Sequence, residues 1–362
     1  MFGCQQVLIK SNQEVKAILE YICSEANKVY NCGLYYARQI YFKERRYITK
    51  FELDKEIKNN LHFKALRSCV AQQTLRSVYE GIASYKALKN KSNKGDLHFK
   101  PKLPNYRKQG LYQVAYPARW VKLVDNNQLK FTLGKETKAW FGVDNFFLTM
   151  PSNLDPKEIK EFRIIPRNGC FYLELVYKKE VESSNLNKDN ALGIDHGLNN
   201  WLTCVSTVGT SFIVDGKQLK SMNNWYNKKV SVLKENKPQG FWSKRLAKIT
   251  EKRNRQMRDA VNKSARIVIN HCLTHDIGTI VFGWNKGQKQ DANMGKKTNQ
   301  KFVAIPTARL KERIKQLCEL YDIQFIEQEE SYTSKASFVD GDSIPTHGEK
   351  PERRMVFKWQ KG

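Results

Sequence analysis

The stretch LGIDHGLNN, residues 192–200, is a short apolar strand that ends on one aspartate, Asp195, and then turns at Gly197. A carboxylate in this position is either a metal ligand or a group that satisfies the amides of a turn. The next two segments, NWLTCVST and SFIVDG, alternate as strands do and are separated by a turn at Gly209. We therefore predict three consecutive strands that begin a new domain.

Helices and strands alternate after these three strands. A long amphipathic basic helix is predicted at about 240–272, with Leu246, Met257 and Val261 on its apolar side. IGTIVFG then predicts a strand, TARLKERIKQLCELYD a helix and IQFIEQEE a last strand. Three antiparallel strands followed by alternating helix and strand is the order of an α/β fold of the ribonuclease H type.

The chain before this domain has a different organisation. Residues 4–10 are predicted as a strand, and two long stretches between residues 12 and 90 carry apolar residues at helical spacing. From residue 112 to 180 the pattern changes to alternation, which predicts a small β-barrel or sheet. The polar stretch VESSNLNKDN, residues 181–190, is interpreted as a boundary between domains.

The charge of the chain points to a polyanion as partner. It has 63 Lys and Arg residues against 36 Asp and Glu, a net charge of +27. No run of eighteen apolar residues is present and the start of the chain is polar, so we expect neither a membrane span nor a signal peptide. Eight scattered cysteines without a C-x-x-C pair predict reduced thiols in a cytoplasm rather than a zinc ribbon or a disulfide framework.

Two basic segments are candidate nucleic-acid contacts. The helix at 240–272 has few acids to neutralise its cations, which favours phosphate contact over a solvated face. The segment FKPKLPNYRKQ, residues 99–109, is kept extended by its prolines, so it is either an RNA-gripping strand or a flexible linker. The candidate residues are Lys244, Arg245, Lys248, Arg253, Arg255 and Lys263 on the helix, and Lys100, Lys102, Tyr106, Arg107 and Lys108 in the segment.

The acids of the C-terminal half form a candidate metal site. Hydrolysis of a phosphodiester by two Mg²⁺ ions needs several carboxylates, and the first and late strands of this fold end near one another. Asp195 ends the first strand, whereas the strand IVFG ends on Gly283 and the last strand leads into Glu329 and Glu330. His196 beside Asp195, and the pair His271 and His275, are interpreted as structural or surface residues.

Four motifs carry a resemblance to a known family: LGIDHGLNNWLTCVST, RNRQMRDAVNKSARIVINHC, IGTIVFGWNKGQKQDANMGKKTNQKFVAIP and IEQEESYTSKASFVDGDSIP. They resemble the TnpB (OrfB) proteins of transposable elements, ancestors of type V CRISPR effectors, over most of the chain. The resemblance implies a guide RNA and a double-stranded DNA target as partners, joined in an RNA–DNA heteroduplex. It also implies a wedge-like β-barrel split over 1–10 and 101–182, a helical recognition insert over 11–100, and a RuvC-like domain over 190–362 that lacks a complete zinc ribbon. Within the insert, Gln72, Gln73 and Arg76 of AQQTLRSVYEGI would help to read the short duplex motif beside the target.

The resemblance also implies a damaged cutting site. Asp195 falls on the family's first catalytic aspartate, but Gly283 stands where most members have a glutamate, and Glu329 or Glu330 is the implied replacement. The family's segment with the third acid is absent, so the chain resembles the nuclease-dead repressors, which need no cofactor to bind. The alternatives are an active endonuclease that uses Mg²⁺, with an acid such as Asp342 as improvised ligand, and a non-functional transposon remnant.

Overall fold

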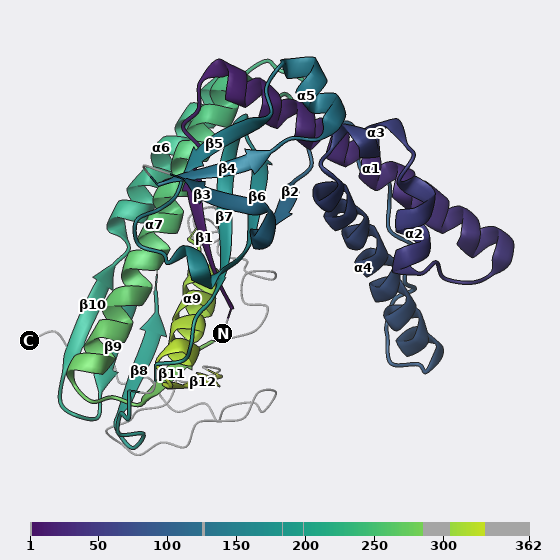
Figure 1. The fold of residues 1–362 in the computed structure, drawn as a ribbon. Helices are drawn as coiled ribbons and strands as arrows, with labels where there is room; N and C mark the ends of the chain where they lie inside the picture. Colours follow the sequence, from purple (N-terminus) through teal and green to yellow (C-terminus); the bar gives the residue numbers. More distant parts are fainter. Residues whose placement is uncertain (1, 125–126, 183, 198, 285–304, 330–362) are drawn as a thin grey trace, which may run out of the picture. The chain divides into compact units, whose positions relative to one another are not determined.

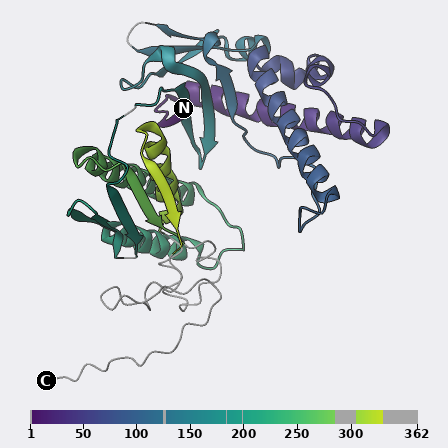
Figure 2. The same cartoon turned by 90° about the horizontal axis from the view of Figure 1, so that it is seen from below.

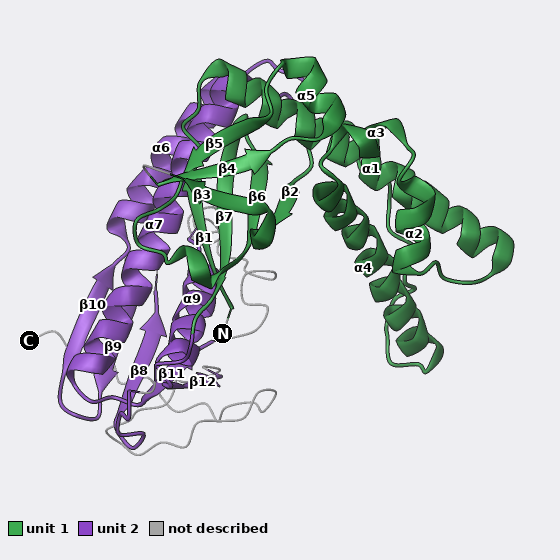
Figure 3. Cartoon of the chain, in the orientation of Figure 1, with its two compact units in different colours: residues 1–179 green, residues 180–362 purple. Residues whose placement is uncertain are grey.

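A computed structural model describes the chain in two compact units, residues 1–179 and 180–362 (Figure 3). The residues that it describes are 2–124, 127–182, 184–197, 199–284 and 305–329. In these ranges no helix is long and apolar enough to cross a membrane. The eight cysteines are free thiols; Cys23 and Cys69 are buried in the first unit, and Cys204, Cys272 and Cys318 in the second.

The five α-helices described in the first unit are α1 (Gln13–Glu44), α2 (Lys50–Ile57), α3 (Leu61–Ala65), α4 (Ser68–Asn93) and α5 (Lys135–Phe141) (Figure 1). Three of them, α1, α2 and α3, begin at capping side chains. The side chain of Asn12 accepts a hydrogen bond from the Val15 N–H at 2.8 Å, which caps α1. Thr49 and Glu52 form a capping box at the start of α2. The left-handed Arg45 at the end of α1 and the capping box at the start of α2 explain why these remain separate helices.

The long helices α1 and α4 pack closely along part of their length. Leu19, Ile22 and Leu34 of α1 and Leu75 and Val78 of α4 are all buried in the core of the unit. The close approach depends on Gly33, because a Cβ atom there would lie 2.5 Å from the Leu75 Cδ2 atom. The predicted helical region between residues 11 and 100 therefore consists of these two helices with α2 and α3.

The strands of the first unit form two open sheets. The first sheet has the order β1 (Phe2–Leu8), β7 (Cys170–Lys178), β6 (Ile159–Arg167) and β2 (Val114–Pro117), and the second has the order β3 (Val121–Val124), β4 (Gln128–Thr132) and β5 (Asn145–Thr149). The expected barrel is therefore not closed by the strands in the described residues. The reason lies between β2 and β3, where Pro117 offers no N–H for pairing and a 3₁₀ helix, Ala118–Trp120, follows it.

The second unit has one five-stranded mixed sheet. Its strand order is β10 (Ser211–Asp215), β9 (Asn200–Ser206), β8 (Ala191–His196), β11 (Thr279–Gly283) and β12 (Gln324–Gln328). The strands β8, β9 and β10 are antiparallel neighbours, whereas β8, β11 and β12 run parallel. This is the predicted order of three antiparallel strands followed by strands that alternate with helices.

Helices cover one face of that sheet. The helices of the unit are α6 (Lys217–Lys234), α7 (Lys244–Thr274) and α9 (Thr307–Leu320). Ala265 and Val268 of α7 and Ile314 of α9 share one buried cluster with Ile194 of β8 and Phe282 of β11. Figures 1 and 2 show α7 and α9 alongside the strands. The predicted basic helix is α7, whereas α6 was not predicted.

Candidate functional site

Asp195 lies at the carboxyl edge of the three parallel strands, where ligands bind in open α/β sheets. It is the fifth of the six residues of β8, and its side chain is exposed. The register places Ile194 of β8 beside Phe282 of β11, and Phe282 beside Glu327 of β12. The carboxyl ends of all three strands therefore meet at Asp195.

The register also decides on which side of the sheet each side chain lies. Successive side chains of a strand point to opposite faces, so Ile194, Phe282 and Glu327 share one face. The next position along each strand lies on the other face, and there the residues are Asp195, Gly283 and Gln328. In these three strands, Asp195 therefore has a glycine and an amide, and no second carboxylate, as its neighbours on its own face.

Glu327 is held on the opposite face by an ion pair. Its Oε2 atom lies 2.8 Å from the Nζ atom of Lys311 on α9, whose side chain is only 8% exposed. The same ammonium lies 4.6 Å from the centroid of the Trp284 ring. Glu327 therefore serves the packing of α9 on the sheet, and it does not face Asp195.

The other predicted acids do not complete a metal site. Glu329 follows β12 and is exposed, whereas Glu330 and Asp342 lie outside the described residues. Within the described ranges, no three His, Cys, Asp or Glu residues come together in a way that could hold a metal ion. The described residues thus do not fit a pair of Mg²⁺ ions, and we derive no metal-dependent step from them.

The histidines of the second unit take part in packing contacts. The ring of His196 lies 5.4 Å from that of Trp284, and the ring of His271 lies 4.6 Å from that of Phe212. His271 Nε2 is 2.9 Å from the Thr210 hydroxyl oxygen. Burial, followed by the neighbouring His275, lowers the pKa of His271 below its usual value. These contacts pack the partly buried His271 against Phe212 and Thr210.

Most of the predicted cations of α7 are free to meet a polyanion. The exposed ones are Lys244, Arg245, Lys248, Arg255 and Lys263. Lys263 forms an i,i+4 ion pair of 2.8 Å with Asp259. This ion pair is weak because both side chains are well exposed, so it does little to withhold Lys263 from a polyanion. Arg253 differs, since its Nε and Nη2 atoms donate to Asn223 Oδ1 of α6 at 3.0 and 2.8 Å. The geometry gives Arg253 the role of joining α6 to α7.

The segment of residues 99–109 is docked on α1. Asn31 holds it at both backbone groups of Arg107, donating to its carbonyl at 2.9 Å and accepting from its N–H at 2.8 Å. The Arg107 guanidinium lies 3.7 Å from the Tyr112 ring centroid and 4.2 Å from that of Tyr30. The segment is therefore held in place on α1 rather than being a free linker, although it forms no β-strand, and Arg107 is engaged with two tyrosines. Lys100, Lys102, Tyr106 and Lys108 remain exposed along it.

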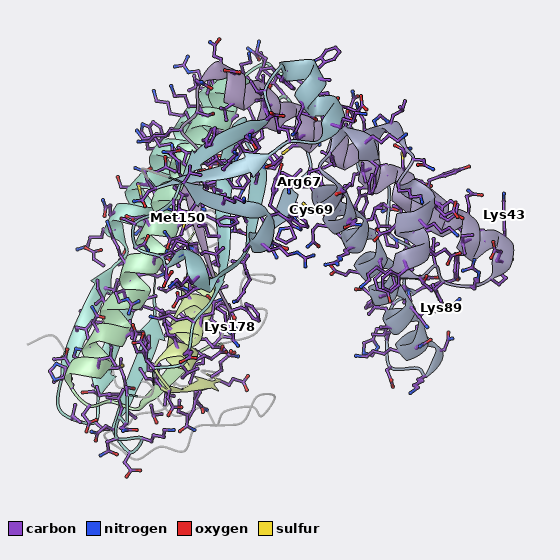
Figure 4. All side chains as sticks on the ribbon, viewed as in Figure 1. Lys43, Arg67, Cys69, Lys89, Met150 and Lys178 are labelled. Atoms are coloured by element: carbon purple, nitrogen blue, oxygen red, sulfur yellow. The ribbon has the colours of Figure 1, made fainter. Side chains whose placement is uncertain are left out.

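A cavity of about 340 Å³ in the first unit brings together the predicted residues of α4. Gln72, Gln73 and Arg76 line it, together with three residues that sequence reasoning missed: Cys69, Pro117 and Arg119. The guanidiniums of Arg119 and Arg67 lie 5.6 and 4.9 Å from the ring centroid of Trp120. Figure 4 shows Arg67 and Cys69 side by side at the beginning of α4.

The lining of this cavity, here called the α4–β2 cavity, suits recognition of a base edge. A glutamine amide presents a donor and an acceptor, and an arginine presents two parallel donors, in the patterns that purine edges accept. Arg76 Nη1 lies 3.4 Å from Gln73 Oε1, so one side chain already orients the other. Of the three missed residues, Pro117 and Arg119 join the cavity only because α4 packs on β2, which no pattern in the sequence reports.

Comparisons with known proteins agree with the resemblance found in the sequence. Residues 174–288 match the model of the family OrfB_IS605, described as a probable transposase. No curated protein matches the chain. The resemblance to the TnpB (OrfB) proteins is therefore confirmed over this segment, which includes Asp195 and Gly283.

Solved structures of RNA-guided complexes are similar to the chain. One is a cryo-EM structure of the Cas12f1–sgRNA–target DNA complex, with 13% identity over 93% of this chain and 77% of that chain and a TM-score of 0.61. Another is the mini-RNA-guided endonuclease CRISPR-Cas_phi3, with 9% identity over 93% of this chain and 86% of that chain and a TM-score of 0.46. The likeness to Cas12f1 establishes a shared fold.

Proposed function

We propose that this protein is an RNA-guided DNA-binding protein that holds its target without cutting it and thereby represses transcription. The observation that carries the proposal is the set Asp195, Gly283 and Gln328 on one face of the parallel strands. Two-metal hydrolysis requires carboxylates that bridge and flank the ions. With a glycine and an amide beside Asp195, the described residues of the three parallel strands offer that site no second carboxylate.

The charge and the fold support nucleic acids as partners. The net charge is +27, and five of the six predicted contact residues on α7 are exposed cations. The fold is shared with a protein whose structure was determined with a guide RNA and target DNA. On this basis the guide RNA pairs with one DNA strand, and α7 contacts the backbone of the resulting heteroduplex without reading its sequence.

The α4–β2 cavity is the proposed reader of a short duplex motif beside the target. Gln73 and Arg76 offer donors and an acceptor to base edges, and Arg119 adds a second guanidinium from the neighbouring strand region. Such contacts discriminate a wrong base by about 1–3 kcal/mol for each good pair of bonds. The cavity therefore gives the protein a way to select a site before the guide pairs.

The decisive experiment offers the purified ribonucleoprotein, isolated with its co-expressed RNA, a plasmid that matches the guide in the presence of Mg²⁺. We expect tight binding of the matched plasmid, no cutting, and the same binding by Asp195→Ala. Cutting by the wild-type complex that Asp195→Ala abolishes would overturn the proposal in favour of an active endonuclease. Absence of any copurified RNA would overturn it in favour of a remnant.

A matched pair of variants tests the α4–β2 cavity. Gln73→Ala is expected to weaken binding to the matched plasmid and to relax selection of the flanking duplex motif. The control is Gln39→Ala, on the helix α1 of the same unit and also partly exposed. Equal effects of the two variants on motif selection would remove the cavity from the proposed reading role.

A further inference from the structure

The sheet β3–β4–β5 has two very different faces. On its inner face Leu129, Phe131, Phe146 and Leu148 are buried. The rings of Phe131 and Phe146 are stacked, with centroids 5.0 Å apart and an interplanar angle of 10°. Because side chains alternate along a strand, this tightly packed face fixes the orientation of every residue on the outer face.

The outer face carries a row of two lysines and one aromatic ring. Lys122 of β3 lies directly opposite Lys130 of β4, and Lys130 lies directly opposite Phe147 of β5. Like charges directly opposite each other destabilise a sheet, and Phe147 keeps 47% of its surface in solvent. The arrangement is therefore unfavourable for the sheet by itself. It favours a ligand that contacts both the two lysines and the Phe147 ring.

Asp144, a described acid whose pKa feels the charge of Lys130, is paired with another cation. Asp144 forms an ion pair of 2.9 Å with Lys138 of α5. The pKa of Asp144 is lowered first by that bond and only secondarily by the charge of Lys130. Among the described residues, no carboxylate forms an ion pair within 4.0 Å of Lys122 or Lys130.

Polar side chains flank the row on the same face. Gln128 lies opposite Thr149, and its Nε2 atom donates to the Thr149 hydroxyl at 3.3 Å. On the other side of the row, Thr132 lies opposite Asn145. Hydroxyl and amide groups at these positions offer donors and acceptors of the kind that a ribose 2′-hydroxyl requires.

We propose that this outer face, called here the β3–β5 platform, binds a single-stranded segment of RNA. A base stacks on Phe147, Lys122 and Lys130 contact the phosphates on either side, and the flanking amides and hydroxyls meet the ribose. Aromatic rings on an open sheet face, beside cations, are a general means of holding unpaired bases. The proposal rests on the proposed function in one respect, namely that the protein binds RNA.

The test uses the full-length protein freed of nucleic acid in high salt. Its affinity for a fluorescent single-stranded oligouridylate is measured by anisotropy, with oligodeoxyuridylate of equal length beside it. Phe147→Leu removes the ring face and keeps an apolar side chain, so we expect binding weakened by about fivefold or more. The control, Trp140→Leu, changes an aromatic side chain that is 76% exposed on α5 and should leave the affinity unchanged.

The lysines are tested through the salt dependence of the same binding. Lys122→Gln and Lys130→Gln should each reduce the slope of log affinity against log salt by about 0.7. The matched control is Lys135→Gln on α5, which should leave the slope unchanged. In parallel, RNA carrying 4-thiouridine is crosslinked to the wild-type protein by light, and the attached peptides are identified by mass spectrometry.

The outcomes separate this inference from the proposed function. If the wild-type protein binds RNA and Phe147→Leu binds as well as Trp140→Leu does, the platform is overturned and the proposed function stands. Equal affinity for the deoxy oligomer would overturn the assignment to RNA, and crosslinks found only outside β3–β5 would overturn the site even where a variant fails to fold. A wild-type protein that binds no RNA at all would remove the basis of both.

Discussion

The ion pair between Lys311 and Glu327 makes an asymmetric prediction about stability. The Lys311 side chain is 8% exposed and that of Glu327 is 31% exposed, and their charged atoms lie 2.8 Å apart. Glu327→Gln leaves a buried ammonium with only the longer, 3.6 Å ion pair to the exposed Glu312, whereas Lys311→Met leaves a carboxylate that water can reach. The first variant should therefore be the more destabilising of the two.

The magnitudes follow from the burial of each partner. A charge-assisted hydrogen bond of this kind contributes about 1.5–3 kcal/mol, so we expect Glu327→Gln to lower the free energy of unfolding by about 2–3 kcal/mol. Lys311→Met keeps an apolar chain over Trp284 and leaves a solvated carboxylate, which should cost about 1 kcal/mol. The double variant should cost less than the sum by about 1–2 kcal/mol.

Urea unfolding of the full chain measures these values, with hydrogen exchange of the β11 and β12 amides to locate the change in the second unit. Neither variant should alter how the ribonucleoprotein binds a matched plasmid, because Glu327 faces away from Asp195. The reasoning is refuted if Lys311→Met costs as much as Glu327→Gln, or if the two effects simply add.

Four further predictions concern the second unit. Gly283→Glu places a carboxylate beside Asp195 and should make thermal unfolding sensitive to Mn²⁺ while the plasmid stays intact; cutting would show that one ligand alone was missing. Arg253→Gln should lower the free energy of unfolding by about 1–2 kcal/mol through its lost bonds to Asn223, with the salt dependence of DNA binding unchanged. Lys248→Gln should reduce the slope of log DNA affinity against log salt by about 0.9 and leave the melting temperature unchanged. The folded-state pKa of His271 lies below 6.5, so the folded state binds fewer protons than the unfolded state and stability falls as the pH drops through about 6.5. The melting temperature should therefore fall more between about pH 7 and about pH 5.5 in the wild-type protein than in His271→Gln.

The main elements of the second unit could be predicted because their patterns are strong. The strand that ends at Asp195 is apolar and bounded by a turn, and α7 has a clear apolar side that becomes buried at Leu246, Val261 and Val268. The helix α6 was not predicted, although Leu219, Met222, Tyr226, Val230 and Leu233 recur in it at helical spacing. Only Leu219 and Asn223 of this helix are buried.

The site was less predictable, because it depends on register and on packing between distant segments. Asp195 and Glu327 lie near the carboxyl ends of two strands of one sheet, and the register places them on opposite faces. A shift of one residue would reverse the face of either side chain. Similarly, Arg119 lines the same cavity as Gln72 only through the packing of α4 on β2. The closure of the barrel was wrongly expected because alternation predicts strands but does not predict which of them pair, and Pro117 ends the pairing of β2.

The buried cysteines are natural chemical reporters in each of the two units. Thiolates react with alkylating reagents and buried thiols do not, so each protected cysteine is modified only when its surroundings open. Cys23 and Cys69 report on the first unit, and Cys204 and Cys272 report on the second. Burial raises the pKa of Cys204 and of Cys272 to about 12. Timed alkylation followed by mass spectrometry of the peptides thus measures the opening of each unit separately, in one unmodified sample and with any nucleic acid bound.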